Sequence, residues 1–176
     1  MNLPKAYQWL AQEPAPRHLL KAVELFGVTE TVGSKHNPVI MGWARELGIQ
    51  NVYTSDEIPW CGLYTAIVIH RAQRPVVNSP LWALSWRNFG VNAEIPMLGD
   101  ILTFTRPKGG GHVGFYVGED DGYYHVLGGN QGNKVSVSRI AKSRFVEARR
   151  PAYNSQPLNV RKIILEPNGV ITTNEF

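Results

Sequence analysis

Only one cysteine, Cys61, occurs among the 176 residues of the chain. A single thiol excludes an internal disulfide framework and a zinc site built from several cysteines. No apolar run is long enough to cross a membrane, and the N-terminal stretch lacks the basic and apolar segments of a secretory signal. We therefore expect synthesis in the cytoplasm, no stable membrane association, and a thiol that is either inert and buried or reactive.

Charge is also scarce: 18% of the residues are charged against 43% hydrophobic, which excludes a disordered or coiled-coil chain. The net charge of +4 would suit an anionic partner such as nucleic acid, anionic lipid or bacterial cell wall. The densest basic groups, however, are the pairs Arg149-Arg150 and Arg161-Lys162, which are too small for a nucleic-acid patch. We expect these pairs to form ordinary surface, and we expect no nucleic-acid partner.

Helix signals fill the first half of the chain. Asn37 is a favourable N-cap, Pro38 suits the first helical position, and Gly48 is a typical terminator. Amphipathic periodicity and similar punctuation indicate three more helices. The predicted helices cover residues 19–27, 38–48, 59–71 and 80–87.

After Gly99 the pattern changes to short runs of β-branched and aromatic residues, which predict antiparallel strands at 101–105, 113–117, 123–127, 134–137 and 145–149. Helices followed by such a meander indicate an α+β fold, with the helices packed on one face of a sheet. We expect one domain over residues 1–153 and a C-terminal tail over 154–176. In the tail we predict an extra strand at 160–165, a turn at 167–169 and a frayed or partner-bound end at 172–176.

Cys61 lies in the first turn of the third predicted helix. The unpaired amide N–H groups and the helix dipole at that position favour the thiolate, which is the nucleophilic form of cysteine. The alternative is an inert core cysteine, which is the more common state of an isolated cysteine. A basic side chain close to the thiol would favour the reactive cysteine over the inert one.

The candidate bases are His18, His36, His70, His112 and His125. His70 falls on the opposite side of the helix that carries Cys61, and His18 and His36 are expected as surface residues near helix ends. His112 follows three glycines at the start of a strand, which leaves room for a substrate. The G-x-G-x-x-G spacing around it does not predict a dinucleotide site, because a strand and not a helix follows.

The hairpin after His112 indicates a third residue. A loop at 120–122 sets a register in which Glu119 faces Tyr123 and His112 stands opposite Asn130, whose amide oxygen would orient the imidazole. A slip of one residue would place Gly129 or Gln131 there instead.

In the same register, His125 falls on the other face of the sheet, so we expect it outside the site. This placement, and the absence of an H-E-x-x-H motif, disfavour a zinc hydrolase.

Four motifs, taken in order, resemble the CHAP and NlpC-type peptidoglycan hydrolases. They are Pro59-Trp60-Cys61, Leu98-Gly99-Asp100-Ile101, Gly111-His112-Val113-Gly114 and Gly128-Gly129-Asn130-Gln131. The resemblance spans residues 27–151 and implies a papain-like α+β fold. It further implies hydrolysis of amide bonds in the peptide part of bacterial cell wall, with Cys61 as nucleophile, His112 as base and Asn130 as its orienter. One position departs from the pattern, because Gly128 stands where many CHAP proteins carry an acidic residue.

An enzyme of this kind would be an endopeptidase or an N-acetylmuramoyl-L-alanine amidase and would need no metal or cofactor. We expect a monomer that acts on peptidoglycan after release or secretion, either as a phage lysin or as a secreted toxin with an immunity or delivery partner. The alternative from another class is a non-catalytic cell-wall-binding module with the same fold.

Further residues are candidates around the site. The oxyanion would meet the backbone N–H of Cys61, with the side chain of Tyr53 as a second candidate. Candidates for contacts with the substrate are Trp60, Trp82, Trp86, Asp100, Gln131 and Glu30. The alternative for the tryptophans is core packing, and for the two acidic residues it is a cap or a contact at the end of a strand.

Overall fold

The computed structural model describes residues 3–14, 16–31, 33, 35–107, 109–167 and 169–172. Its order of elements is α+β, with helices in the first half and strands in the second, as predicted. The helices are η1 (Lys5–Gln12), α1 (Arg17–Glu24), α2 (Pro38–Glu46), α3 (Cys61–Arg71), η2 (Ala83–Asn88) and η3 (Lys142–Arg144), where η denotes a 3-10 helix. The strands are β1 (Val91–Asn92), β2 (Ile101–Thr105), β3 (Gly111–Glu119), β4 (Tyr123–Gly128), β5 (Ser136–Ala141) and β6 (Phe145–Arg150).

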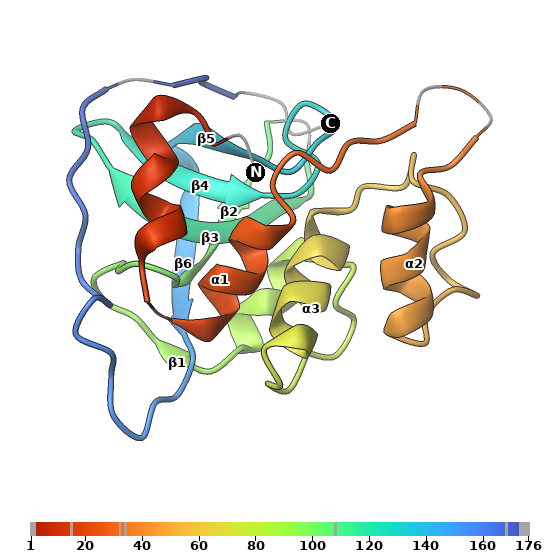
Figure 1. Ribbon diagram of the computed structural model, residues 1–176, viewed down its shortest axis with the longest axis horizontal. Helices are drawn as coiled ribbons and strands as arrows, with labels where there is room; N and C mark the ends of the chain where they lie inside the picture. The colour runs from red at the N-terminus through yellow and green to blue at the C-terminus, as the bar shows by residue number, and fades with distance from the viewer. Residues whose placement is uncertain are drawn as a thin grey trace.

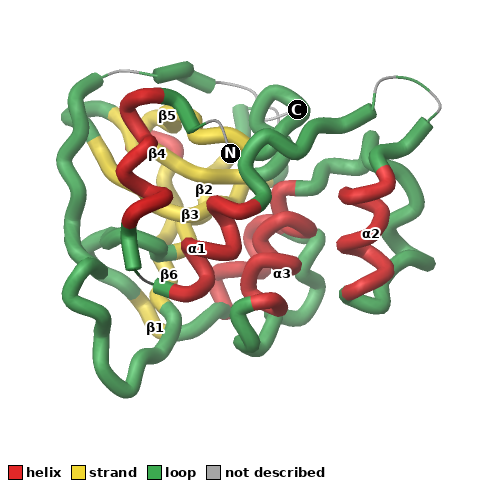
Figure 2. Tube along the Cα trace, in the orientation of Figure 1, coloured by secondary structure: helices red, strands yellow, loops and turns green. Residues whose placement is uncertain are grey.

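The six strands form one antiparallel sheet in the order β1-β6-β2-β3-β4-β5 (Figure 1). Strands β2 to β5 form the predicted meander, and β6 returns to the far side of β2. The colouring by secondary structure in Figure 2 shows α1 and α3 in front of this sheet, with α2 to the outside of α3.

Helix α3 lies at the centre of the core. Its first nine residues, from Cys61 to Ile69, are all buried, because α1 and α2 flank the helix and β3 lies beneath it. A helix that is apolar on all sides is expected in such a position. The start of α3 is thereby held by packing on several sides, and this is the end that carries the cysteine.

The sequence placed α2 correctly. Asn37 caps the helix, with its side-chain oxygen 2.7 Å from the Val39 nitrogen, and Pro38 occupies the first helical position. Two other predicted elements differ from the structure. The fourth predicted helix is a short 3-10 helix that begins at Ala83 rather than at Pro80, and the strand predicted at 134–137 is β5, which begins at Ser136.

The shift of β5 has a local cause. Lys134 forms a bridge with Thr29, and the Val135 nitrogen donates to the Val28 carbonyl at 2.7 Å, so these residues pair with the chain after α1 and not with β4. Neither η1 nor β1 was predicted, because η1 has no capping residue and β1 has only two residues.

The predicted strand at 160–165 is wrong for the described residues. This segment forms only an isolated bridge between Ile164 and Glu119, because its backbone meets β3 at the last residue of that strand alone. Ile163 and Leu165 nevertheless pack against the core, so the tail covers part of the sheet. Residue 168 of the predicted turn and residues 173–176 of the predicted end lie outside the described residues.

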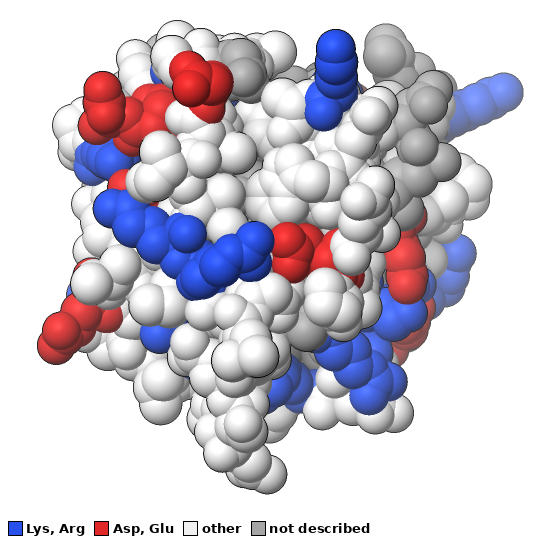
Figure 3. All heavy atoms as spheres, turned by 60° about the vertical axis from the view of Figure 1, so that its left-hand side comes forward, with Lys and Arg blue, Asp and Glu red and all other residues white. Residues whose placement is uncertain are grey.

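The basic pairs are engaged with acidic partners. Arg149 bonds Glu147, Arg150 bonds Asp100, Arg161 bonds Glu13 and Lys162 bonds Glu119. The face in Figure 3 shows basic side chains next to acidic ones rather than a broad patch of one sign. None of the described helices has the length and apolar character needed to cross a membrane.

Candidate functional site

A cavity of about 610 Å³ opens beside the first turn of α3. The Cys61 side chain lies in its wall, although the residue as a whole is only 3% exposed. Most of the lining is apolar and comes from the chain before α3, from the loop before η2 and from the β2–β3 turn. The lining side chains include Ile49, Val52, Ile58, Leu81, Trp82 and Arg106.

The position of the thiol follows from close packing of the first turn of α3. A Cβ at Gly62 would lie 2.3 Å from the Pro80 carbonyl oxygen, so glycine is required for the approach of the loop that lines the cavity. Cys61 is thus held at the helix start, where the backbone N–H groups favour a negative charge on sulfur. A guanidinium nitrogen of Arg106 lies 4.0 Å from the sulfur, and its positive charge favours the thiolate too.

His112 is the second residue of β3 and is fully buried. It pairs with Phe104 of β2, and the centroids of the two rings are 6.5 Å apart. The preceding residue, Gly111, lines the cavity together with Cys61. The structure therefore brings the start of β3 and the start of α3 to one cavity, while the pairing of Cys61 with His112 itself stays a prediction.

Gln131 contacts the His112 ring. The side-chain oxygen of Gln131 lies 3.0 Å from His112 Nε2, and its side-chain nitrogen donates to the carbonyls of Val126 and Ser136 at 3.1 and 2.6 Å. Two carbonyl acceptors fix the orientation of the amide, because only its nitrogen can donate to them. The amide oxygen must then accept from Nε2–H, which leaves Nδ1 as the basic nitrogen of the neutral ring.

The backbone also holds Gln131 in place. Its N–H donates to the Lys134 carbonyl at 3.0 Å, and its own carbonyl accepts from the Ser136 hydroxyl at 3.0 Å. A Cβ at Gly128 would lie 2.7 Å from the Gln131 side-chain oxygen and 3.2 Å from His112 Nε2. Glycine at this position therefore makes room for the contact between amide and imidazole.

The contact with His112 that was predicted for Asn130 is made by its neighbour, Gln131. Asn130 is 3% exposed, and its side-chain oxygen has no hydrogen-bond partner among the described residues. Strand β4 ends at Gly128, and Asn130 has a φ of 56°, so the chain has left the extended conformation before it reaches the position opposite His112. The prediction treated 130 as a strand residue, whereas the chain turns there and Gln131 reaches back to the ring.

The predicted register is right at one end of the hairpin and wrong at the other. Phe115 pairs with Leu127 as predicted, but Glu119 pairs with Tyr124 and not with Tyr123. An irregularity between Tyr116 and Gly118 absorbs the difference of one residue. A bulge of this kind has no clear signal in the sequence.

His125, which was expected outside the site, belongs to a buried network. Its Nε2 is 2.9 Å from an Asp120 oxygen, and its Nδ1 is 2.8 Å from the Tyr7 hydroxyl. Arg139 bonds the same Asp120 oxygen at 2.7 Å. Burial lowers the pKa of His125, with Asp120 opposing the effect. Burial would raise the pKa of Asp120, but its bonds with Arg139 and His125 hold it at about 2.

The other histidines differ in their surroundings. His18 was expected at the surface but is fully buried, with Nε2 donating to the Gly99 carbonyl at 2.7 Å, and burial lowers its pKa to about 4. The prediction failed because α1 packs the His18 face inward, against Phe115. His36 lies near the surface and bonds Asp56 at 2.9 Å, and His70 is exposed near the end of α3.

Tyr53 does not support the oxyanion role proposed for it. Its hydroxyl donates to the Ile58 carbonyl at 3.2 Å, and its side chain is fully buried outside the cavity lining. Burial, together with the charges of Asp56 and Glu30, raises the pKa of Tyr53. At the start of α3, no side chain of the described residues caps the helix at Trp60.

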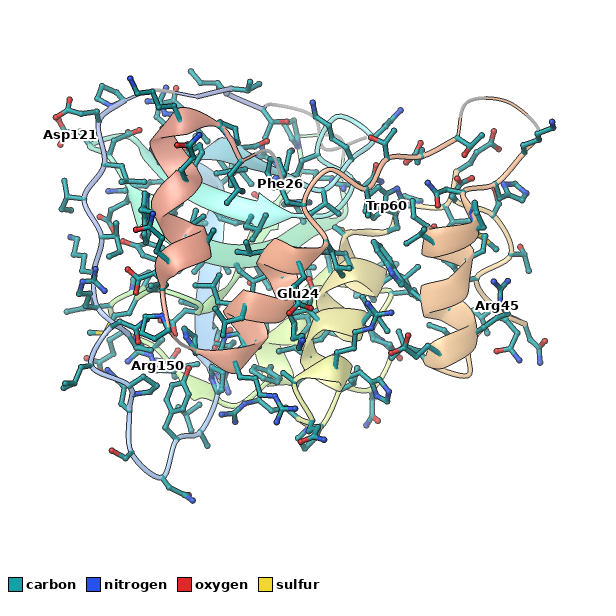
Figure 4. The ribbon with its side chains drawn as sticks, in the orientation of Figure 1. Glu24, Phe26, Arg45, Trp60, Asp121 and Arg150 are labelled. Carbon is teal, nitrogen blue, oxygen red and sulfur yellow. The ribbon has the colours of Figure 1, made fainter. Side chains whose placement is uncertain are left out.

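Of the three candidate tryptophans, only Trp82 lines the cavity, and it is 64% exposed. Trp60 and Trp86 are fully buried, and their indole nitrogens donate to Glu30 at 2.6 Å and to the Pro80 carbonyl at 3.0 Å. Figure 4 shows Trp60 where the start of α3 approaches α2. These two side chains are core residues, which was the alternative in the sequence analysis.

Asp100 is also structural. Arg150 bonds both of its carboxylate oxygens, at 2.9 and 2.7 Å, and the Met97 nitrogen bonds one of them at 2.8 Å. Burial raises the pKa of Asp100, although these partners oppose the shift. This is the strand-end contact that the sequence analysis gave as its alternative.

Within the described residues, no group of three or more histidine, cysteine or acidic side chains is arranged to hold a metal ion. In comparisons with known proteins, no family model matches this chain and no curated protein matches it in sequence.

Proposed function

We propose that this protein is a thiol hydrolase that cuts amide bonds, with Cys61 as nucleophile, His112 as general base and Gln131 as the residue that orients the imidazole. The observation that carries the proposal is the fixed amide of Gln131. Because that amide accepts from Nε2–H, the neutral His112 ring presents a basic Nδ1. The thiol at the start of α3 and the residue before His112 line one cavity.

In this reaction His112 Nδ1 takes the proton of Cys61, and the thiolate attacks the carbonyl carbon of the substrate. The oxyanion accepts from N–H groups at the start of α3. His112 then gives its proton to the leaving amine as the carbon–nitrogen bond breaks. A water molecule, deprotonated by His112, attacks the thioester, and the carboxylic acid and the thiol are released.

The substrate class in this proposal is the peptide part of bacterial peptidoglycan. It follows from the motif resemblance around Cys61, His112 and Gln131, whereas the contacts support thiol chemistry in general. The papain-like fold is proposed on the same basis. The α+β order, the cysteine at a helix start and the histidine on a following strand agree with such a fold.

Digestion of purified peptidoglycan tests the proposal. The protein should release soluble fragments, whose masses identify the bond that is cut, and Cys61→Ala should release none while keeping its fold by circular dichroism. Replacing the thiol by hydrogen leaves at most a small cavity, so the variant is a fair control. Release of fragments by Cys61→Ala would refute the thiol mechanism. Binding of peptidoglycan without any release would favour the non-catalytic cell-wall-binding module.

A further inference from the structure

We propose that Arg106 selects substrates with a carboxylate next to the amide bond that is cut. The inference rests on the proposed function and names its substrate class more narrowly. The guanidinium nitrogen lies 4.0 Å from Cys61 Sγ, and Arg106 is part of the cavity wall. A reacting carbonyl carbon must come within about 3 to 3.5 Å of the sulfur. A group one or two bonds from that carbon would then be within reach of the guanidinium.

The composition of the cavity wall favours an anion over a cation. Among the described residues that line it, Arg106 alone carries a charge, and the others are apolar side chains, prolines, glycines, one serine and the thiol. An ammonium group placed there would meet no acidic partner in the wall, and burial of an unpaired charge is costly. A carboxylate would meet a planar guanidinium that can donate two parallel hydrogen bonds.

The apolar wall indicates the rest of the ligand. Trp82 and Val52 are 64% and 69% exposed, and both line the cavity. An acyl group with an apolar body would cover these side chains while its carboxylate meets Arg106. Removal of water by this body would strengthen the charged contact, because the local dielectric constant falls.

Alkylation of Cys61 by two nearly isosteric reagents tests the anion site without any enzyme substrate. Iodoacetate is charged and iodoacetamide is neutral, and with both the thiolate forms a carbon–sulfur bond as iodide leaves. Because the two reagents attack the same thiolate, the ratio of their rates does not depend on the fraction of thiol that is ionised. We expect the iodoacetate-to-iodoacetamide ratio, normalised to glutathione, to be above one in the wild type.

Arg106→Gln should lower this ratio about tenfold, the value of one charged hydrogen bond. Arg106→Lys should lower it less, because lysine keeps the charge but lacks the planar fork. The matched control is Arg45→Gln, which removes one exposed positive charge that is not part of the cavity wall. Figure 4 shows Arg45 on the outer side of α2. An unchanged ratio in Arg106→Gln, or an equal fall in Arg45→Gln, would overturn the inference. If Arg106→Gln does not fold, the same comparison of Arg106→Lys with the wild type decides.

A pair of stem peptides separates this inference from the proposed function. One peptide has a free carboxylate next to the scissile amide, and in the other that carboxylate is amidated. We expect the wild type to cleave the free form with kcat/KM about tenfold higher and Arg106→Gln to cleave the two alike. Equal cleavage by the wild type would refute the role of Arg106 and leave the hydrolase intact. No cleavage of either peptide, with the alkylation ratio as expected, would refute the hydrolase and keep the anion site.

Discussion

His112 and His125 are both fully buried on neighbouring strands of one sheet, yet they are held differently. Asp120 and Tyr7 occupy both ring nitrogens of His125. His112 is bound at Nε2 by the neutral amide of Gln131, and the residue before it lines the cavity with Cys61. Burial alone therefore does not separate the histidine that we propose as the base from the one in the structural network. What differs between them is the partners of the two ring nitrogens and, for His112, a neighbouring residue in the wall of the cavity.

The largest expected effect is the opposite response of these two histidines to alanine. His112→Ala should lower hydrolysis about 1,000-fold or more, because the nucleophile and its base act as a unit. His125→Ala should keep most of the activity per folded molecule and lower the free energy of unfolding by about 2 to 4 kcal/mol, because it removes a buried bond to Asp120. Activity assays and urea titration of both variants measure the contrast. An inactive but stable His125→Ala would reverse the assignment.

The next prediction separates Gln131 from Asn130. Gln131→Ala should lower kcat about 10- to 100-fold, because it removes the acceptor that orients His112 and leaves the nucleophile and base in place. Asn130→Gly is the matched control, since glycine accepts the φ of 56° while the side chain is lost. We expect this control to change kcat less than about threefold, because the Asn130 side-chain oxygen accepts no hydrogen bond from the described residues and Gln131, not Asn130, contacts His112. A larger loss in Asn130→Gly than in Gln131→Ala would return the orienting role to Asn130.

Much of the fold could be predicted because local signals agreed with the final packing. Asn37 and Pro38 define the start of α2, and the β-branched run at 101–105 matches β2 to the residue. The predictions that were wrong, the hairpin register and the start of β5, concern features that depend on long-range contacts. The irregularity between Tyr116 and Gly118, and the pairing of Val135 with Val28, are decided by contacts between segments far apart in the chain.

The candidate site shows the same contrast between features set by local signals and features set by long-range contacts. The positions of Cys61 at the start of a helix and of His112 near the start of a strand could be predicted from the sequence. Gln131 was named only as a substrate contact and as the outcome of a register slip, because its role depends on a turn at Asn130. Asparagine and glycine around this position were the available signal, since both favour a positive φ. The burial of His18 had no such signal, because a single helical histidine gives no indication of which face will pack.

The smallest expected effect concerns the pH dependence of stability and a third buried histidine. The pKa of His18 is about 4 in the folded state against 6.5 as a model value, so the unfolded state binds more protons between these values. The free energy of unfolding should therefore fall as the pH drops from about 6.5 to 4. At about 1.4 kcal/mol for each pKa unit, the total loss is up to about 3 kcal/mol.

Urea unfolding at several pH values measures this effect. His18→Gln, which does not titrate, should show a shallower decline in the same range. The Asp120 carboxyl, with a pKa of about 2, loses its contribution only below about pH 4 and so leaves this window undisturbed. Equal slopes for the wild type and His18→Gln would show that His18 titrates normally in the folded protein.

The central claim, that His112 activates the Cys61 thiol, is tested most directly by the rate of iodoacetamide labelling of Cys61 as a function of pH. The rate reports the thiolate, so its midpoint is the pKa of the thiol. We expect a midpoint well below the ordinary value of about 8.5 in the wild type and in His125→Ala, and a rise of at least about one unit in His112→Ala. A midpoint near the ordinary value that does not move in His112→Ala would contradict the account.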